Sequence, residues 1–79
     1  MKKTTKPVKS KTARELLALN LRLMRVRKGI TQEQLAMEAG VNKNYISQIE
    51  TASRAVSVDI VDKLARALDI PVATLLIYE

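Results

Sequence analysis

The 79-residue chain contains no cysteine and no histidine. These absences exclude disulfide bonds, zinc sites and catalytic schemes that need a thiol or an imidazole. No apolar run approaches the roughly 20 residues of a transmembrane helix, and the basic N-terminus lacks the apolar segment of a secretory signal. We therefore expect a cytoplasmic protein without a cofactor or metal, and no small-molecule ligand is evident.

Glycine and proline occur only twice each, and the aromatic residues are limited to Tyr45 and Tyr78. Leucine and alanine are frequent, which favours an all-α fold. The chain has no Gly-rich phosphate loop, and its acidic residues are scattered over predicted helix surfaces, so we expect no enzymatic activity. A single domain of 8.8 kDa buries only about 60–65% of its unfolded surface, so we expect a second subunit to support it.

Positive charge is concentrated in the first third of the chain. Residues 1–28 hold ten Lys and Arg and one acid, a net charge of +9, whereas residues 29–79 carry −3. A basic excess of this kind attracts nucleic acid or an anionic membrane. We interpret residues 1–11 as a flexible basic arm and residues 12–79 as the folded domain. The arm lacks the apolar face that stable membrane insertion requires, so we expect no membrane partner.

Capping residues predict where each helix begins and ends. Thr12 with Glu15, and Thr31 with Gln34, form capping boxes for helices over residues 13–28 and 32–39. Asn42 caps a third helix from Lys43 to about residue 50. The short turn between the second and third helices predicts a helix-turn-helix. A fourth helix is predicted after Ser57, and a fifth over residues 72–78. We expect Met24 and Met37 to lie in the core with the leucines.

Three segments resemble the lambda-repressor-like (xenobiotic-response-element) helix-turn-helix family: LRLMRVRKGITQEQLA from residue 21, GVNKNYISQIE from residue 40 and LARAL from residue 64. The similarity spans about residues 14–77 and implies a five-helix DNA-binding domain. YISQIE, followed by Ser53-Arg54 and Ser57, is most similar to the controller proteins of restriction–modification systems, which are small dimeric regulators. Ala52 and Val56 depart from the Gly and Pro of many relatives. Because positive φ favours glycine, the loop there can differ in shape.

The first turn of the third helix is the part of a helix-turn-helix that meets base edges in the major groove. Lys43 can donate to guanine, and Asn44 can pair with adenine. Gln48 lies one turn beyond Asn44 and is a third candidate base reader. The alternatives are that Lys43 contacts only phosphate, that Asn44 only caps, and that Gln48 is solvated.

Contacts with the DNA backbone are predicted for a second set of residues. Gln32 begins the second helix, whose N-terminus suits a phosphate, and the resemblance implies a backbone contact there. The resemblance also implies a DNA contact for the arginine in the loop after the third helix. The complete set is Gln32, Tyr45, Ser47, Ser53 and Arg54, and for most of these the alternative is an ordinary solvated side chain.

The resemblance implies a structural ion pair between Arg25 and Glu50. It also suggests that the acidic face of Glu33 and Glu38 touches RNA polymerase, as in related activators, although a solvated face is the alternative. The nearly all-apolar helix over residues 72–78 is typical of a buried or interface element. We therefore predict a two-fold dimer interface formed by Val72, Leu75, Leu76 and Tyr78.

Together these features predict a sequence-specific regulator that binds double-stranded DNA as a homodimer. Its two recognition helices would lie about 34 Å apart on a near-palindromic operator. An antitoxin or anti-regulator of the same fold, which binds a protein partner through the C-terminal surface, is the alternative.

Overall fold

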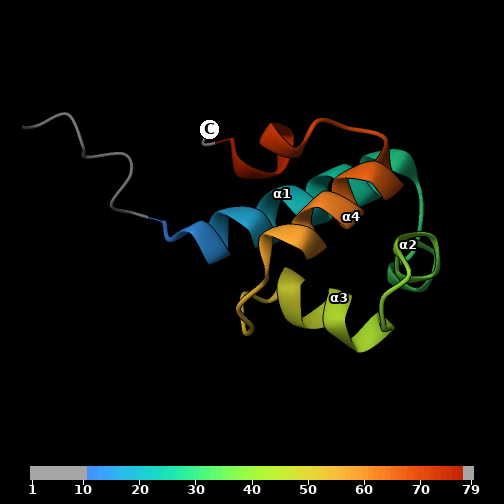
Figure 1. Cartoon of the computed structure of the whole chain (residues 1–79), viewed down its shortest axis with the longest axis horizontal. Coiled ribbons are helices and arrows are strands. Elements are labelled where there is room, and N and C mark those ends of the chain that lie inside the picture. Colours follow the sequence, from blue (N-terminus) through green and yellow to red (C-terminus); the bar gives the residue numbers. More distant parts are fainter. Residues whose placement is uncertain (1–10, 78–79) are drawn as a thin grey trace, which may run out of the picture.

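A computed structural model describes residues 11–77. These residues fold into four α-helices and one 3-10 helix and contain no strand. In Figure 1, α1 (Ala13–Lys28) and α4 (Val58–Leu68) cross the middle of the molecule. The helices α2 (Gln32–Ala39) and α3 (Lys43–Glu50) lie at one end and along the lower edge, and the 3-10 helix η2 (Val72–Leu76) lies on the opposite side. Apart from the exposed Lys11, the predicted arm lies outside the described residues.

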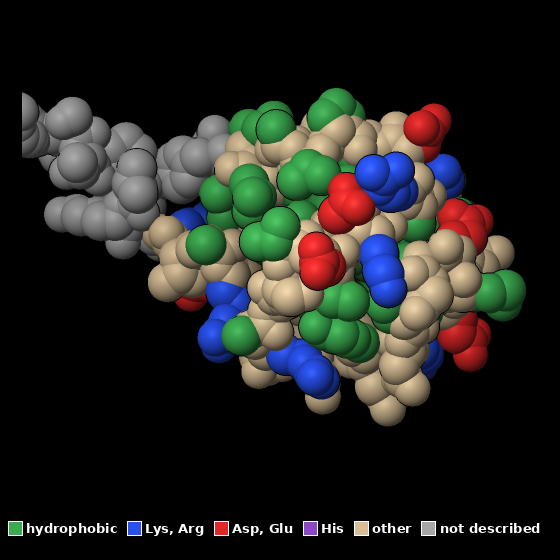
Figure 2. Space-filling view, viewed as in Figure 1, with side chains coloured by type: hydrophobic (Ala, Val, Ile, Leu, Met, Phe, Trp, Pro, Cys, Tyr) green, Lys and Arg blue, Asp and Glu red, His purple; other side chains and the backbone are tan. Residues whose placement is uncertain are grey.

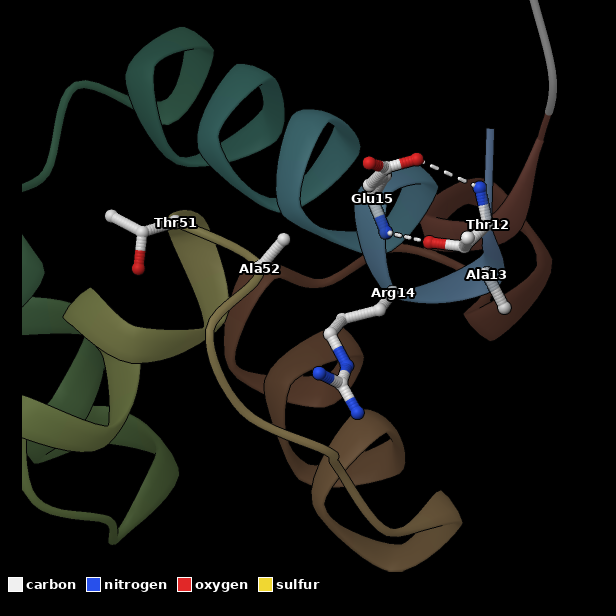
Figure 3. A pocket seen from close by; sticks show the side chains of 6 residues that line it. All are labelled: Thr12, Ala13, Arg14, Glu15, Thr51 and Ala52. Carbon is white, nitrogen blue, oxygen red and sulfur yellow. Dashed lines mark hydrogen bonds between the residues drawn. The ribbon is translucent and has the colours of Figure 1, made fainter. Parts of the chain in front are cut away.

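Side-chain caps define the helix boundaries as predicted. The Glu15 N–H donates to Thr12 Oγ1 at 3.1 Å, and the Thr12 N–H donates to Glu15 Oε1 at 2.9 Å (Figure 3). Thr31 and Gln34 repeat this capping box at the start of α2. Gly29 and Gly40 end α1 and α2 with φ of 75° and 74°, a left-handed conformation that glycine adopts at little cost. The boundaries of α1 and α2 therefore follow from local sequence.

The hydrophobic core joins all five elements. Its fully buried side chains come from every element of the fold: Leu21, Leu35, Ile46, Ile49, Leu64 and Leu75. Met24 packs against this cluster, as expected. The prediction for Met37 is wrong, because its side chain is 79% exposed. Met37 follows the buried Leu35 by two residues, which is about 200° around an α-helix, so it lies on the outer face of α2.

The C-terminal element is a 3-10 helix and not the predicted α-helix over residues 72–78. The Thr74 N–H donates to the Pro71 carbonyl at 3.0 Å, three residues back, as this helix type requires. The buried Asn20 of α1 donates to the carbonyls of Leu75 at 3.1 Å and Ile77 at 2.8 Å. These bonds tie the backbone at Leu75 and Ile77 to α1, and Ile77 itself is extended.

Leu75 belongs to the monomer's own core and is 0% exposed. The prediction that Leu75 forms the dimer interface is therefore wrong, since the fold of one chain already covers it. Val72 and Leu76 are 38% and 45% exposed, and Tyr78 lies outside the described residues. The apolar side chains of η2 thus divide between one core anchor and an exposed pair.

Candidate nucleic-acid interface

The turn between α2 and α3 presents one face of α3 to solvent. The Val41 N–H donates to the Ala36 carbonyl at 2.9 Å, and Asn42 Oδ1 accepts from the Asn44 N–H at 2.7 Å. Ile46 and Ile49 anchor the inner side of α3 in the core. The outer side is polar: Lys43, Asn44 and Gln48 are exposed, and Ser47 is half-buried.

Three polar side chains, those of Arg25, Gln32 and Glu50, form a hydrogen-bonded cluster that holds the end of α3 in place. Arg25 Nε donates to Glu50 Oε2 at 2.6 Å, and Arg25 Nη2 donates to Glu50 Oε1 at 3.1 Å. Gln32 Nε2 donates to the same Oε1 at 3.0 Å. Arg25 Nη1 also donates to the Ile30 carbonyl at 2.9 Å. The cluster thereby joins α1, the start of α2 and the end of α3.

Burial makes this cluster more than a surface ion pair. The side chains of Arg25 and Glu50 are only 14% and 5% exposed. The hydrogen bond from Arg25 to Glu50 raises the pKa of Arg25 above its ordinary value, although desolvation opposes the shift. The guanidinium therefore keeps its charge throughout the physiological pH range. Gln32 contacts Glu50, a partner that the sequence interpretation did not include, and the second hydrogen of its amide nitrogen is left for a further acceptor.

Arg54, Tyr45 and Gln48 form a second cluster on the outer side of α3. The guanidinium carbon of Arg54 lies 4.2 Å from the centroid of the Tyr45 ring, within the range of a cation–π interaction. Arg54 Nη1 donates to Gln48 Oε1 at 2.8 Å. In the sequence, only the three-residue spacing of Tyr45 and Gln48 on a helix indicates that these two side chains are neighbours, and no local pattern adds Arg54 to them.

Hydroxyl groups fasten the end of α3 to the loop that follows. Ser53 Oγ donates to the Gln48 carbonyl at 3.2 Å and lies 2.9 Å from Thr51 Oγ1. Thr51 Oγ1 also lies within bonding distance of the carbonyls of Ser47 and Gln48. Thr51 was not among the predicted site residues. The Ser53 hydroxyl faces the end of α3, so its placement is that of a capping group.

The start of α1 lies beside this loop. Thr12, Ala13, Arg14 and Glu15 line one wall of an open depression of about 610 Å³, and Thr51 and Ala52 line the other (Figure 3). Ala52 has φ 59°, a left-handed conformation that glycine adopts more easily than alanine. The start of α1 therefore lies next to the loop that carries Arg54.

Apolar side chains gather on a different side of the molecule, over α4 and η2 (Figure 2). Val58 is 80% exposed, and Ile77 is 47% exposed. Between α1, α4 and η2 runs a groove of about 340 Å³ whose lining is mostly apolar: Ala13, Arg14, Leu17, Ala55, Val56, Val58, Val61 and Leu76. This surface is separate from the polar outer side of α3.

None of the helices between residues 11 and 77 has the length and apolar character needed to cross a bilayer. Within the same residues, no three acidic side chains come together in a way that would hold a metal ion.

Comparison with known proteins places this geometry in a family. The helix-turn-helix family profile matches residues 21–75. A hypothetical transcription factor from Neisseria meningitidis serogroup B is 38% identical over 64 residues, which cover 81% of this chain and 60% of that protein. The chain thus spans about three fifths of the length of this relative.

Solved structures of controller proteins share the fold. The restriction–modification controller protein C.AhdI from Aeromonas hydrophila superposes with a TM-score of 0.77 at 37% identity, over 78% of this chain and 94% of that one. The controller protein C.Esp1396I, solved as a tetramer with its natural 35-base-pair operator, superposes with a TM-score of 0.76 at 25% identity, over 82% and 86% of the two chains. The chain described here belongs to the lambda-repressor-like helix-turn-helix family and is a homologue of the restriction–modification controller proteins.

Proposed function

We propose that this chain is a sequence-specific regulator of transcription that binds double-stranded DNA as a homodimer and controls a restriction–modification operon. The observation that carries the proposal is the polar outer side of α3, which is exposed while Ile46 and Ile49 hold its inner side in the core. The buried Arg25–Glu50 pair keeps α3 fixed against α1 and α2. A braced helix with a free polar face is the part of a helix-turn-helix that enters the major groove.

Base recognition is assigned to the exposed side chains of α3. Lys43, in the first turn, is a donor suited to the O6 and N7 acceptors of guanine, and Asn44 can pair bidentately with adenine. Gln48, one turn further on, reaches the next part of the groove. A good bidentate contact discriminates against the wrong base by about 1–3 kcal/mol.

Backbone contacts then set the position of the helix on the duplex. The N-terminus of α2 offers unpaired N–H groups to a phosphate, and Gln32 has an amide hydrogen to add. Tyr45, Ser47 and Arg54 flank the outer side of α3 and are proposed to contact the sugar–phosphate backbone, with Ser53 in a minor role. The basic arm, residues 1–11, precedes α1 in the sequence and is proposed to follow the DNA, because its positive charge attracts the phosphates.

Dimerisation is assigned to the apolar surface over α4 and η2. Val72 and Leu76 are exposed there, and Tyr78 continues the same segment of the chain. A two-fold contact through this surface would leave α3 free on each subunit and set the two recognition helices about one turn of DNA apart, roughly 34 Å. That C.Esp1396I was solved as a tetramer on its operator supports an oligomer on DNA.

The proposed setting is the cytoplasm, in association with the nucleoid, and no catalytic role is proposed. We assign a contact with RNA polymerase to Glu33 and Glu38, which are exposed on α2.

The alternative role, an antitoxin that holds another protein on the apolar surface, predicts a chain that is monomeric alone. Sedimentation of the purified chain distinguishes the two roles.

Selection of bound fragments from random duplex DNA, followed by footprinting, tests this function. The wild-type chain should enrich a near-palindromic sequence. Lys43→Ala and Asn44→Ala should each weaken binding to that sequence about 5- to 100-fold and relax the preference at particular base pairs. Lys63→Ala, which removes an exposed lysine of α4, is the matched control and should leave the preference unchanged. Unaltered footprints for both α3 variants would contradict the assignment of α3.

A further inference from the structure

The contact between Arg54 and Gln48 determines which way the Gln48 amide faces. Arginine carries only hydrogen-bond donors. The Gln48 atom that lies 2.8 Å from Arg54 Nη1 must therefore be the oxygen, because the opposite orientation would set two N–H groups against each other. The amide nitrogen of Gln48, with its two hydrogens, is then directed away from Arg54.

Two other contacts hold Arg54 in this position. The guanidinium stacks on the Tyr45 ring at 4.2 Å, and the ring itself packs against the core. The Ser53 N–H donates to the Gln48 carbonyl at 3.0 Å, which fixes the backbone next to Arg54 relative to Gln48. The arrangement is thus present in the free protein and does not require DNA.

We propose that Arg54 is a positioning residue that makes Gln48 a donor-only reader of bases, so that Gln48 selects guanine and not adenine. The proposal rests on the function assigned to α3 above and names the base that one of its side chains recognises. A free glutamine pairs with adenine by accepting from N6 and donating to N7. With its oxygen bonded to a cation, Gln48 offers donors, which match the N7 and O6 acceptors of guanine.

Charge reinforces this selection. Gln48 Oε1 has a second lone pair that an adenine amino group could approach. That amino group would then lie close to the Arg54 guanidinium, and two hydrogen-bond donors would face each other. A guanine in the same place presents its N7 and O6 acceptors to the two hydrogens of the Gln48 amide. Tyr45 contributes through its ring, and its hydroxyl is not needed for this role.

The test is selection from random duplex DNA with the full-length wild-type chain, Gln48→Ala, Arg54→Ala, the double variant and Tyr45→Phe. Gln48→Ala should relax one base pair at which the wild type prefers guanine about 5- to 100-fold. Arg54→Ala should shift the preference at that same pair from guanine towards adenine, because the amide is released. The double variant should match Gln48→Ala at that pair, and Tyr45→Phe should keep guanine because the ring is retained.

Several results would overturn the proposal. It fails if the wild type prefers adenine at the pair that Gln48→Ala relaxes, if Arg54→Ala leaves the preference there unchanged, or if Gln48→Ala alters no base pair. Loss of preference with Tyr45→Phe would also contradict it. Gln48 and Arg54 are exposed, so these variants should fold, which circular dichroism checks. The assigned function is tested separately: the wild type should enrich a half-site, and Lys43→Ala should relax the preference at a base pair other than the one that Gln48→Ala relaxes.

Discussion

Replacing Glu50 with alanine should destabilise the domain far more than its position at the end of a short helix suggests. Glu50 accepts hydrogen bonds from Arg25 Nε, Arg25 Nη2 and Gln32 Nε2, at 2.6, 3.1 and 3.0 Å, and its side chain is 5% exposed. Breaking one partner of a buried pair costs about 3–5 kcal/mol, because the other charge stays buried and unpaired. Arg25 keeps its bond to the Ile30 carbonyl, so we expect a loss of about 3 kcal/mol.

Such a loss is easily measured, since a domain of this size has a free energy of unfolding of about 4–12 kcal/mol. Urea unfolding followed by circular dichroism gives the difference between variant and wild type. Asp62→Ala is the matched control, because it removes an acid from the exposed pair with Arg66, whose side chains are 78% (Arg66) and 45% (Asp62) exposed. An exposed i,i+4 pair contributes about 0.3–0.5 kcal/mol.

The double variant Arg25→Met, Glu50→Leu replaces both charges of the buried pair with apolar side chains. It therefore distinguishes the cost of leaving one charge unpaired from the contribution of the ion pair itself. It should cost less than Glu50→Ala, because no unpaired charge is left inside the protein. A surface ion pair contributes no more than about 1 kcal/mol. If Glu50→Ala lowers the free energy of unfolding by less than that amount, the cluster does not hold α3 in place as described.

Two further changes test the loop and the apolar surface. Ala52→Gly should raise the free energy of unfolding by about 1 kcal/mol. Ala52 has φ 59°, and only glycine adopts that conformation without a side-chain penalty. A lower urea midpoint for the variant than for the wild type would contradict this. Leu76→Asp should shift the chain towards the monomer in sedimentation velocity, since a charge on the proposed two-fold surface stays unpaired on association. A dimer of unchanged strength would locate the interface elsewhere.

Local signals in the sequence were sufficient for the helix boundaries of the DNA-binding unit. Capping boxes, the glycines after α1 and α2, and Asn42 each act within three or four residues, so the residues that decide the structure are neighbours in the chain. The binary pattern of α3 likewise predicts which side is buried, because Ile46 and Ile49 are three residues apart.

The errors concern contacts between distant parts of the chain. Asn20 bonds to the carbonyl of Leu75, 55 residues away, and this contact helps to end the last element as a short 3-10 helix. Composition showed that residues 72–78 are apolar, but it did not show that Leu75 points into the core while Leu76 faces outwards. The prediction for Met37 fails because Met37 lies about 200° from the buried Leu35 around α2, so its apolar side chain faces solvent.

The polar clusters also depend on tertiary placement. Gln32 reaches Glu50 because the N-terminus of α2 lies beside the end of α3, which no local pattern in the sequence specifies. Arg54 stacks on Tyr45 and meets Gln48 because the loop after α3 turns back over the helix, with Ala52 in the left-handed region. The sequence predicts these residues as candidates one at a time, and the fold determines which of their side chains contact one another.

The structure of the chain bound to a duplex selected from random DNA tests the central claim most directly. The account predicts that α3 lies in the major groove with Lys43 and Asn44 within hydrogen-bonding distance of base edges. It also predicts a second copy about 34 Å away along the DNA, in the next turn of the groove. A complex in which the duplex lies against another face, with the outer side of α3 still open to solvent, would contradict it.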